Sequence, residues 1–265
     1  MSIIHQDGVD MVDYASLADR MMDIIGFEHP PVAVTLVKEG MEVPEEYEQP
    51  EKKMSHCQSI MEARKGNFLY VPADLHSCPV GASSLGLVEL PEKVASGEFH
   101  HGLGMFDSPE AAKQMIEERY ELDYGSAIGT AVSPLQWAKL EPDAIVQVGL
   151  PEQIYWLVPA FTYNKGGRVH LSTAAFQATC VDSTIIPILT GKLSLSLGCF
   201  GCRRRTDIGE EEMLAGIPPA AFEEMVKALE NLAQGSIQRA RRLDKEKRPG
   251  RERWKPMQRY RPEVR

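Results

Sequence analysis

Two long stretches of the chain carry apolar residues at helical spacing. Over residues 13–25 one apolar stripe is followed by Gly26, which predicts an amphipathic helix that ends at the glycine. Near the other end, a pair of prolines precedes a stripe over residues 222–232, which predicts another amphipathic helix. Residues 32–37 form a short run rich in β-branched side chains after a Pro-Pro pair, and this run predicts a buried strand.

The segments between these elements are shorter and alternate in type. Residues 38–54 are polar with two prolines and several glutamates, which indicates a solvated loop. The pattern predicts further helices over residues 56–64, 108–121, 151–158 and 181–189. It predicts further strands over residues 68–71, 142–149, 170–173 and 193–197.

The order of these signals is similar in the two halves of the chain, although residue identity between the halves is low. Each half has a buried strand after a proline, then a cysteine, a helical segment, a glycine, a short strand and a second cysteine. We therefore predict an α+β or mixed α/β fold in a single domain over residues 1–235, with an internal repeat of about residues 28–105 and 140–218 as one interpretation. In that interpretation two pseudo-equivalent α/β halves face each other. Residues 236–265 are expected to be a basic helical extension or tail.

Composition supports a globular protein, and charge separates the body from the tail. The chain has 265 residues, 43% of them hydrophobic, and a net charge of −9. Twelve Lys and Arg against four Asp and Glu follow residue 235, so the body is strongly acidic and the tail basic. An acidic body disfavours nucleic-acid binding except through the tail. The tail has two interpretations, an arm that docks an acidic surface or RNA, and a segment that folds back on the acidic body.

The five cysteines are the main chemical signal. An odd number of cysteines, with no secretory signal over residues 1–14 and no apolar run long enough to span a bilayer, favours a cytoplasmic protein whose thiols are free. Cys199 and Cys202 form a CxxC pair, whose sulfurs can reach one metal. Cys57, Cys78 and Cys180 could supply further ligands, and the predicted repeat would place Cys78 and Cys199 at equivalent positions.

Three arginines and two histidines offer weaker signals. Arg203, Arg204 and Arg205 follow the CxxC pair directly and could bind the anionic part of a cofactor, or could instead pair with the glutamates at 210–212 in a solvated turn. They could also lower the pKa of Cys202, which leaves a thiol enzyme as an alternative. We interpret His100 and His101 as surface side chains of a loop, because adjacent residues point in different directions.

Seven short motifs resemble one protein family. They are Pro31-Val32-Ala33-Val34, Cys57-Gln58 with Ala63-Arg64-Lys65-Gly66, Cys78-Pro79-Val80-Gly81, Pro142-Asp143-Ala144-Ile145, Ala175-Phe176-Gln177-Ala178-Thr179-Cys180, Gly198-Cys199-Phe200-Gly201-Cys202-Arg203 and Met213-Leu214-Ala215-Gly216-Ile217-Pro218. In these the chain resembles the domain of unknown function 169 family of archaea and anaerobic bacteria, over about residues 15–233. The resemblance implies a cytoplasmic α/β protein in an anaerobic setting, where an oxygen-sensitive cluster is tolerable, and it implies no particular activity.

Together these observations predict a cytoplasmic metal- or iron–sulfur-binding protein that acts in redox chemistry or cofactor handling in anaerobic metabolism. The expected ligands are Cys57, Cys78, Cys199 and Cys202, with Cys180 as an alternate. The cofactor would be an iron–sulfur cluster, with zinc or none as alternatives. The expected partners are a larger enzyme, or a small anionic or tetrapyrrole-type ligand, and no membrane. Two other classes stay open, namely a binding or assembly factor with buried structural cysteines and a thiol-dependent enzyme.

Overall fold

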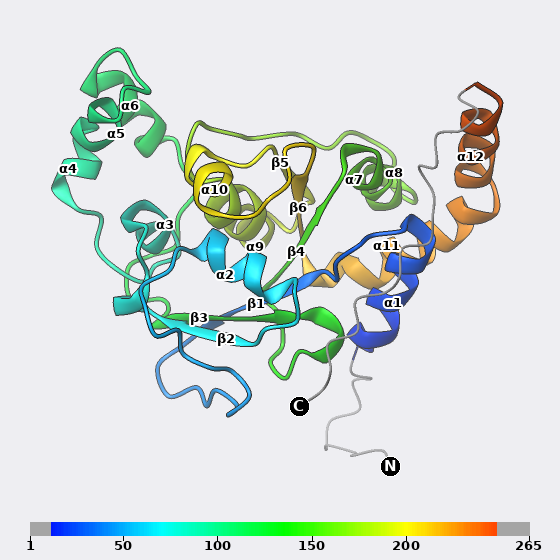
Figure 1. The fold of residues 1–265 in the computed structure, drawn as a ribbon, viewed down its shortest axis with the longest axis horizontal. Coiled ribbons are helices and arrows are strands. Elements are labelled where there is room, and N and C mark those ends of the chain that lie inside the picture. The colour runs from blue at the N-terminus through cyan, green and yellow to red at the C-terminus, as the bar shows by residue number, and fades with distance from the viewer. Residues whose placement is uncertain (1–11, 248–265) are drawn as a thin grey trace.

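A six-stranded antiparallel sheet runs through the centre of the molecule. The computed structural model describes residues 12–247 (Figure 1). The strands lie in the order β2-β3-β1-β4-β6-β5, and every neighbouring pair is antiparallel. Their bounds are β1 Val32–Val37, β2 Leu69–Pro72, β3 Gly129–Pro134, β4 Ala144–Gly149, β5 Ser194–Ser196 and β6 Met213–Ile217.

The strand order is symmetric about the central β1–β4 pair. From the edge of the sheet to its centre, the first three strands of the chain lie in the order β2-β3-β1 and the last three in the order β5-β6-β4. Each half of the chain therefore builds one half of the sheet. The two halves meet where Val32 pairs with Val146 and Ala33 with Ile145. The strand β3 lies outside the predicted first repeat of residues 28–105, and the internal repeat stays a prediction.

Helices cover both faces of the sheet (Figure 1). The α-helices are α1 Tyr14–Ile25, α2 His56–Ala63, α3 Pro79–Ser84, α4 Glu92–Ala95, α5 Glu98–Gly102, α6 Pro109–Glu117, α7 Pro151–Tyr155, α8 Leu157–Thr162, α9 Ile186–Thr190, α10 Phe200–Arg205, α11 Pro219–Gln234 and α12 Ser236–Lys247. Two short 3₁₀ helices, η1 Ala73–Leu75 and η2 Leu135–Trp137, and a π-helix, η3 Ala178–Ile185, complete the set.

Alternation along the strands assigns each helix to a face. Ala33 and Ile145 point to the side where α1, α8 and α11 form one apolar core. Val32 and Val146 point to the opposite side and pack with Ile60 of α2 and with the start of α10. The helix η3 lies on this second side too, against β4, β5 and β6. The second face therefore brings together all the segments that carry cysteines.

The predicted fold class is confirmed as a mixed α/β single domain, and most predicted elements lie where they were expected. The strand expected over residues 170–173 is wrong, because that segment has no regular structure. The strands β3 and β6 and the helix α10 directly after Cys199 were not predicted. The loop expected around His100 and His101 is also wrong, because both belong to α5.

The body ends in two consecutive helices that run to residue 247. Gly235 separates α11 from α12, and α12 contributes the fully buried Ile237 and a hydrogen bond from Arg241 to the carbonyl of Ile24 at 2.6 Å. The first part of the predicted basic extension is thus helical and docked on α1 and α11. The rest of that prediction, from residue 248 onward, lies outside the described residues. Within residues 12–247 no helix combines the length and apolar character needed to cross a bilayer.

Candidate functional site

Cys78 and Cys199 occupy the same structural position in the two halves. Each is the residue that caps the N-terminus of a short helix, α3 and α10 respectively. The sulfur of Cys78 accepts a hydrogen bond from the backbone N–H of Gly81 at 3.5 Å. The sulfur of Cys199 accepts one from the N–H of Cys202 at 3.4 Å. A backbone N–H group therefore points at each of the two sulfurs.

Cys180 is positioned by an unusual piece of backbone. It lies in the first turn of η3, and π-helical turns are frequent at functional sites. The residue before this helix, Gln177, has φ of 74°, the sole positive φ of a residue other than glycine within residues 12–247. Such a conformation costs about 1–3 kcal/mol and persists where the surroundings hold it in place.

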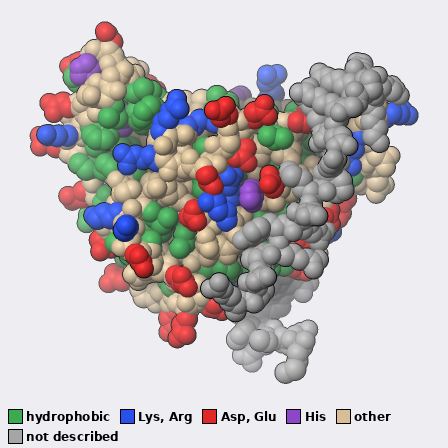
Figure 2. All heavy atoms as spheres, viewed as in Figure 1, with side chains coloured by type: hydrophobic (Ala, Val, Ile, Leu, Met, Phe, Trp, Pro, Cys, Tyr) green, Lys and Arg blue, Asp and Glu red, His purple; other side chains and the backbone are tan. Residues whose placement is uncertain are grey.

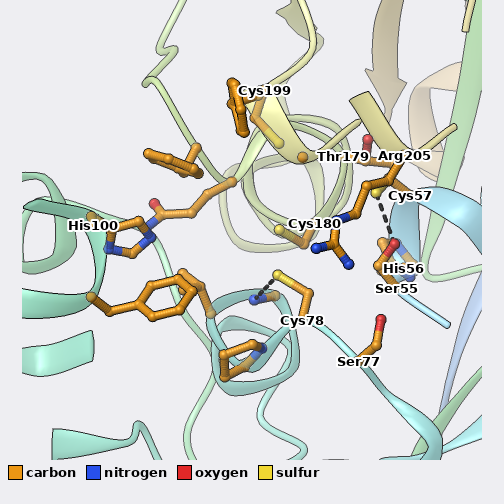
Figure 3. A pocket seen from close by; sticks show the side chains of 18 of the residues that line it. Ser55, His56, Cys57, Ser77, Cys78, His100, Thr179, Cys180, Cys199 and Arg205 are labelled. Carbon is orange, nitrogen blue, oxygen red and sulfur yellow. Dashed lines mark hydrogen bonds between the residues drawn. The ribbon is translucent and has the colours of Figure 1, made fainter. Parts of the chain in front are cut away.

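Four of the five cysteines line one cavity of about 210 Å³. Cys57 from α2, Cys78, Cys180 and Cys199 lie around it, and Figure 3 shows their side chains approaching from separate segments. A Cβ atom placed on Gly81 would lie 3.4 Å from the sulfur of Cys180 and 3.6 Å from that of Cys78. The two sulfurs are therefore close neighbours, and the missing side chain leaves space beside them.

The fifth cysteine, Cys202, lies behind the cavity wall. It is fully buried, and its sulfur accepts a hydrogen bond from Thr179 at 3.5 Å and another from the thiol of Cys57. The bond from Cys57 lowers the pKa of Cys202 to about 6, and the same bond together with burial raises the pKa of Cys57. Burial also raises the pKa of Cys78 and of Cys180. All five thiols are free of disulfides.

The three arginines have three different environments. Arg203 donates hydrogen bonds to the carbonyls of Leu197 at 2.7 Å and Glu212 at 2.6 Å, so its guanidinium holds the turn after α10 together. Arg204 is exposed. Arg205 lines the cavity, and Figure 3 shows its guanidinium reaching toward the thiols. Of the predicted anion-binding set, Arg205 alone reaches the cavity.

A second wall of the cavity carries residues that the sequence did not single out. It is formed by Phe99 and His100 of α5, by Leu103 directly after that helix, and by the consecutive Phe176 and Gln177. His100 is fully buried and not on the surface as expected. No sequence signal marks this burial, because the apolar Phe99 and Leu103 on either side of His100 are themselves exposed. Gln177 carries no signal either, because its importance comes from its backbone conformation.

The thiols surround a space and do not converge on one point. Within residues 12–247 no three His, Cys, Asp or Glu side chains gather closely enough to hold a metal ion as they stand. The two histidines beside the first cysteines are buried and neutral, since burial lowers the pKa of His56 to about 3 and that of His76 to about 4. His56 lines the cavity and hydrogen-bonds to Thr184 at 3.0 Å.

The comparisons with known proteins show the family of this chain. Residues 20–228 match the family model DUF169, described as "Uncharacterised ArCR". The uncharacterized protein MJ0308 of Methanocaldococcus jannaschii is 32% identical over 228 residues, which cover 85% of this chain and 97% of the relative. No solved structure matches the chain. The chain belongs to the DUF169 family, as the motifs predicted.

Proposed function

We propose that the protein binds an iron–sulfur cluster in the thiol-lined cavity, with Cys57, Cys78, Cys180 and Cys199 as ligands. The observation that carries this proposal is that four thiols from four separate segments line one cavity. Free cysteines are more often buried singly as small apolar residues. Four around a single space are the number that the common iron–sulfur clusters take.

The surroundings of the sulfurs suit a cluster with negative charge. The backbone N–H groups of Gly81 and Cys202 already point at the sulfurs of Cys78 and Cys199, and hydrogen bonds to sulfur tune the potential of such clusters. Arg205 adds a positive charge at the cavity. Because burial raises the pKa of Cys78, that thiol is protonated at neutral pH, and binding of the cluster must release its proton.

The shape of the site favours a polynuclear cluster over a single zinc ion. Zinc takes four ligands at about 2.3 Å from each sulfur, so its ligands must converge on a point. Here the sulfurs border a cavity of about 210 Å³, which a group of several atoms could fill. In this proposal Cys202 is not a ligand but supports Cys57 from behind.

The wider role follows from the same proposal. We infer a cytoplasmic protein of anaerobic metabolism that uses the cluster in electron transfer or cofactor handling, with a larger enzyme as its partner. Five free thiols favour a reducing compartment. Figure 2 shows hydrophobic side chains gathered beside the α4–α6 lobe at upper left, in a region that could contact such an enzyme.

The decisive experiment is anaerobic purification of the full chain, followed by iron and sulfide analysis and visible and electron paramagnetic resonance spectra. We expect iron and acid-labile sulfide in equal amounts and the absorption of thiolate-bound iron. After anaerobic reconstitution with iron and sulfide, a protein that still carries neither would overturn the proposal.

Alanine variants test the ligand set. Replacement of Cys57, Cys78, Cys180 or Cys199 should each strongly reduce the cluster content. Cys202→Ser is the matched control, because it removes a thiol that lies outside the cavity and keeps a hydrogen-bonding group beside Cys57 and Thr179. If Cys202→Ser abolishes the cluster while one of the four cavity variants keeps it in full, the assignment is wrong.

A thiol enzyme is the second candidate, and the contact between Cys57 and Cys202 favours it. The hydrogen bond from Cys57 lowers the pKa of Cys202 and so favours its thiolate form. Reactive cysteines are also accessible, however, and Cys202 is fully buried. Alkylation at pH 6.5 separates the candidates, since a thiol enzyme predicts rapid modification of Cys202 in the native protein, whereas the cluster proposal predicts that Cys202 resists until the chain unfolds.

A further inference from the structure

The cavity has a second end whose residues have no role in cluster binding. There the aromatic rings of Phe99 and Phe176 and the side chain of Leu103 enclose the polar groups of His100 and Gln177. The ring of His100 lies against that of Phe176, with centroids 4.4 Å apart, and against that of Phe99 at 5.1 Å. Figure 3 shows His100 facing the cavity from the side opposite Cys57.

His100 is fully buried, and neither of its ring nitrogens has a hydrogen-bond partner within residues 12–247. Burial lowers its pKa, so the ring is neutral and presents one donor and one acceptor. A buried polar group left without a partner costs about 1–3 kcal/mol. The structure therefore keeps an unsatisfied donor and acceptor at the edge of a cavity.

Gln177 provides a second, independent unsatisfied group in the same place. Its side chain is 4% exposed, and its amide nitrogen has no partner among the described residues. Its positive φ adds backbone strain that glycine or asparagine would largely avoid. Strain and an unpaired amide at one position indicate that the side chain is retained for what it binds.

We propose that this end of the cavity binds a planar heteroaromatic ring that carries a lactam or carboxamide edge. The aromatic side chains offer faces for stacking, and His100 and Gln177 offer a neutral set of donors and an acceptor to the polar edge of the ring. Among the described residues that line the cavity, Arg205 is the one with a full charge, and Figure 3 shows it near Cys57, across the cavity from His100. The polar edge of the ring is therefore recognised by hydrogen bonds and not by charge.

The dimensions of the cavity limit the ligand to a small one. The volume of about 210 Å³ belongs to the whole cavity, the thiol end included. The part beside His100 and Gln177 therefore suits a single ring. Phe99, Leu103 and Phe200 are 42%, 48% and 46% exposed and line the cavity, so they form an open apolar rim through which a ring can enter.

This inference does not rest on the cluster, because the residues that carry it are not cysteines. Ring binding is measured on the full-length protein both as purified and after anaerobic reconstitution. The probes are nicotinamide and uracil, and toluene is the control that has a ring without a polar edge. Saturation-transfer NMR detects binding, and titration gives the dissociation constants.

Two variants remove the polar groups while they preserve the fold. His100→Phe keeps a buried ring, and Gln177→Gly suits the positive φ and should raise the melting temperature. His170→Phe is the matched control, because His170 is exposed and lies outside this cavity. We expect each test variant to weaken binding of at least one probe by tenfold or more, and the control to bind as the unmodified protein does.

Three results would each overturn the inference. They are binding of neither polar ring, toluene binding as tight as that of the polar rings, and unchanged affinity in both His100→Phe and Gln177→Gly. A protein without iron that still binds nicotinamide or uracil in this way would leave the inference intact and overturn the cluster proposal alone. A protein with its cluster that binds no polar ring would do the reverse.

Discussion

Replacement of Gly81 by alanine tests the thiol site without removing a thiol. Gly81 lies in α3 at the cavity, and a Cβ there would meet the sulfurs of Cys180 and Cys78 at 3.4 and 3.6 Å. Both distances are ordinary van der Waals contacts, so the free protein accommodates the methyl group. A cluster bound to the same two sulfurs must share that space with it.

Gly81→Ala should have opposite effects on the stability of the free protein and on its affinity for the cluster. In the free protein, exchange of glycine for alanine within a helix stabilises by up to about 1 kcal/mol. In the loaded protein, an added methyl in a filled site costs about 1–3 kcal/mol. The cluster affinity changes by the sum of the cost and the gain, about 1–4 kcal/mol. At 1.4 kcal/mol for each factor of ten, the cluster should be held about fivefold to several-hundredfold less tightly.

The assay compares iron loss to a chelator, followed by visible absorption, with urea unfolding of the iron-free protein. Gly102→Ala is the matched control, because Gly102 is a helical glycine of α5 whose added Cβ would meet nothing within 4 Å. We expect faster iron loss in Gly81→Ala alone. If Gly81→Ala unfolds no earlier than the unmodified protein and retains iron equally well, the cluster does not occupy the space between these sulfurs.

Two further predictions concern buried groups. Arg64 is 4% exposed and pairs with Glu212 through two hydrogen bonds of 2.9 and 3.1 Å. Arg64→Met should therefore lower the free energy of unfolding, measured in urea, by about 3–5 kcal/mol. A loss below about 1 kcal/mol would contradict this. Burial lowers the pKa of His100 in the folded protein below its unfolded value of about 6.5. The contribution of His100 to the free energy of unfolding is therefore fully present above a pH of about 6.5, and it is lost as the pH falls toward the pKa of the folded protein. His100→Phe should therefore gain stability relative to the unmodified protein as pH falls from about 7.5 to 5, and a constant difference would contradict the buried neutral ring.

The elements with strong periodicity were predictable because their pattern reflects burial directly. The helix α1 shows an apolar stripe, its Asp13 accepts the N–H of Ser16 at 3.0 Å, and Gly26 ends it with φ of 84°. The strand β1 is a run rich in β-branched residues that is buried on both faces. In these segments the residues that favour the local conformation are also the residues that pack in the core.

The strands β3 and β6 were not predictable for the opposite reason. Gly129–Pro134 and Met213–Ile217 are mixtures of small and apolar residues, and glycine within a strand weakens the local signal. Their conformation is set by neighbouring strands, since β3 pairs with β1 and β2, and β6 with β4 and β5. Residues 170–173 had a strand-like pattern but no partner strand in the structure.

The candidate site was predictable to a similar extent. The cysteines could be singled out because their chemistry is rare, and their spacing suggested that Cys78 and Cys199 are equivalent. The sequence could not distinguish the four that line the cavity from Cys202, because CxxC spacing does not say which sulfur points inward. The aromatic end of the cavity was missed because α5 and the segment before η3 are brought to the thiols by tertiary packing.

Gly216 connects both ends of the cavity to the sheet, and its replacement is the last prediction. A Cβ on Gly216 of β6 would lie 2.3 Å from the carbonyl oxygen of Ser183 in η3 and 2.7 Å from Pro187, so backbone must move. We expect Gly216→Ala to lower the free energy of unfolding by about 1–3 kcal/mol or more.

The displaced helix η3 carries Cys180 in its first turn and begins directly after Gln177. Gly216→Ala should therefore weaken both iron retention and ring binding, whereas Gly81→Ala affects the first and His100→Phe the second. Chelator kinetics and NMR titration on the folded fraction of each variant measure the two effects. If Gly216→Ala leaves iron retention and ring binding unchanged, the two ends of the cavity do not depend on the packing of η3 against β6. The role that we assign to the π-helix would then be wrong.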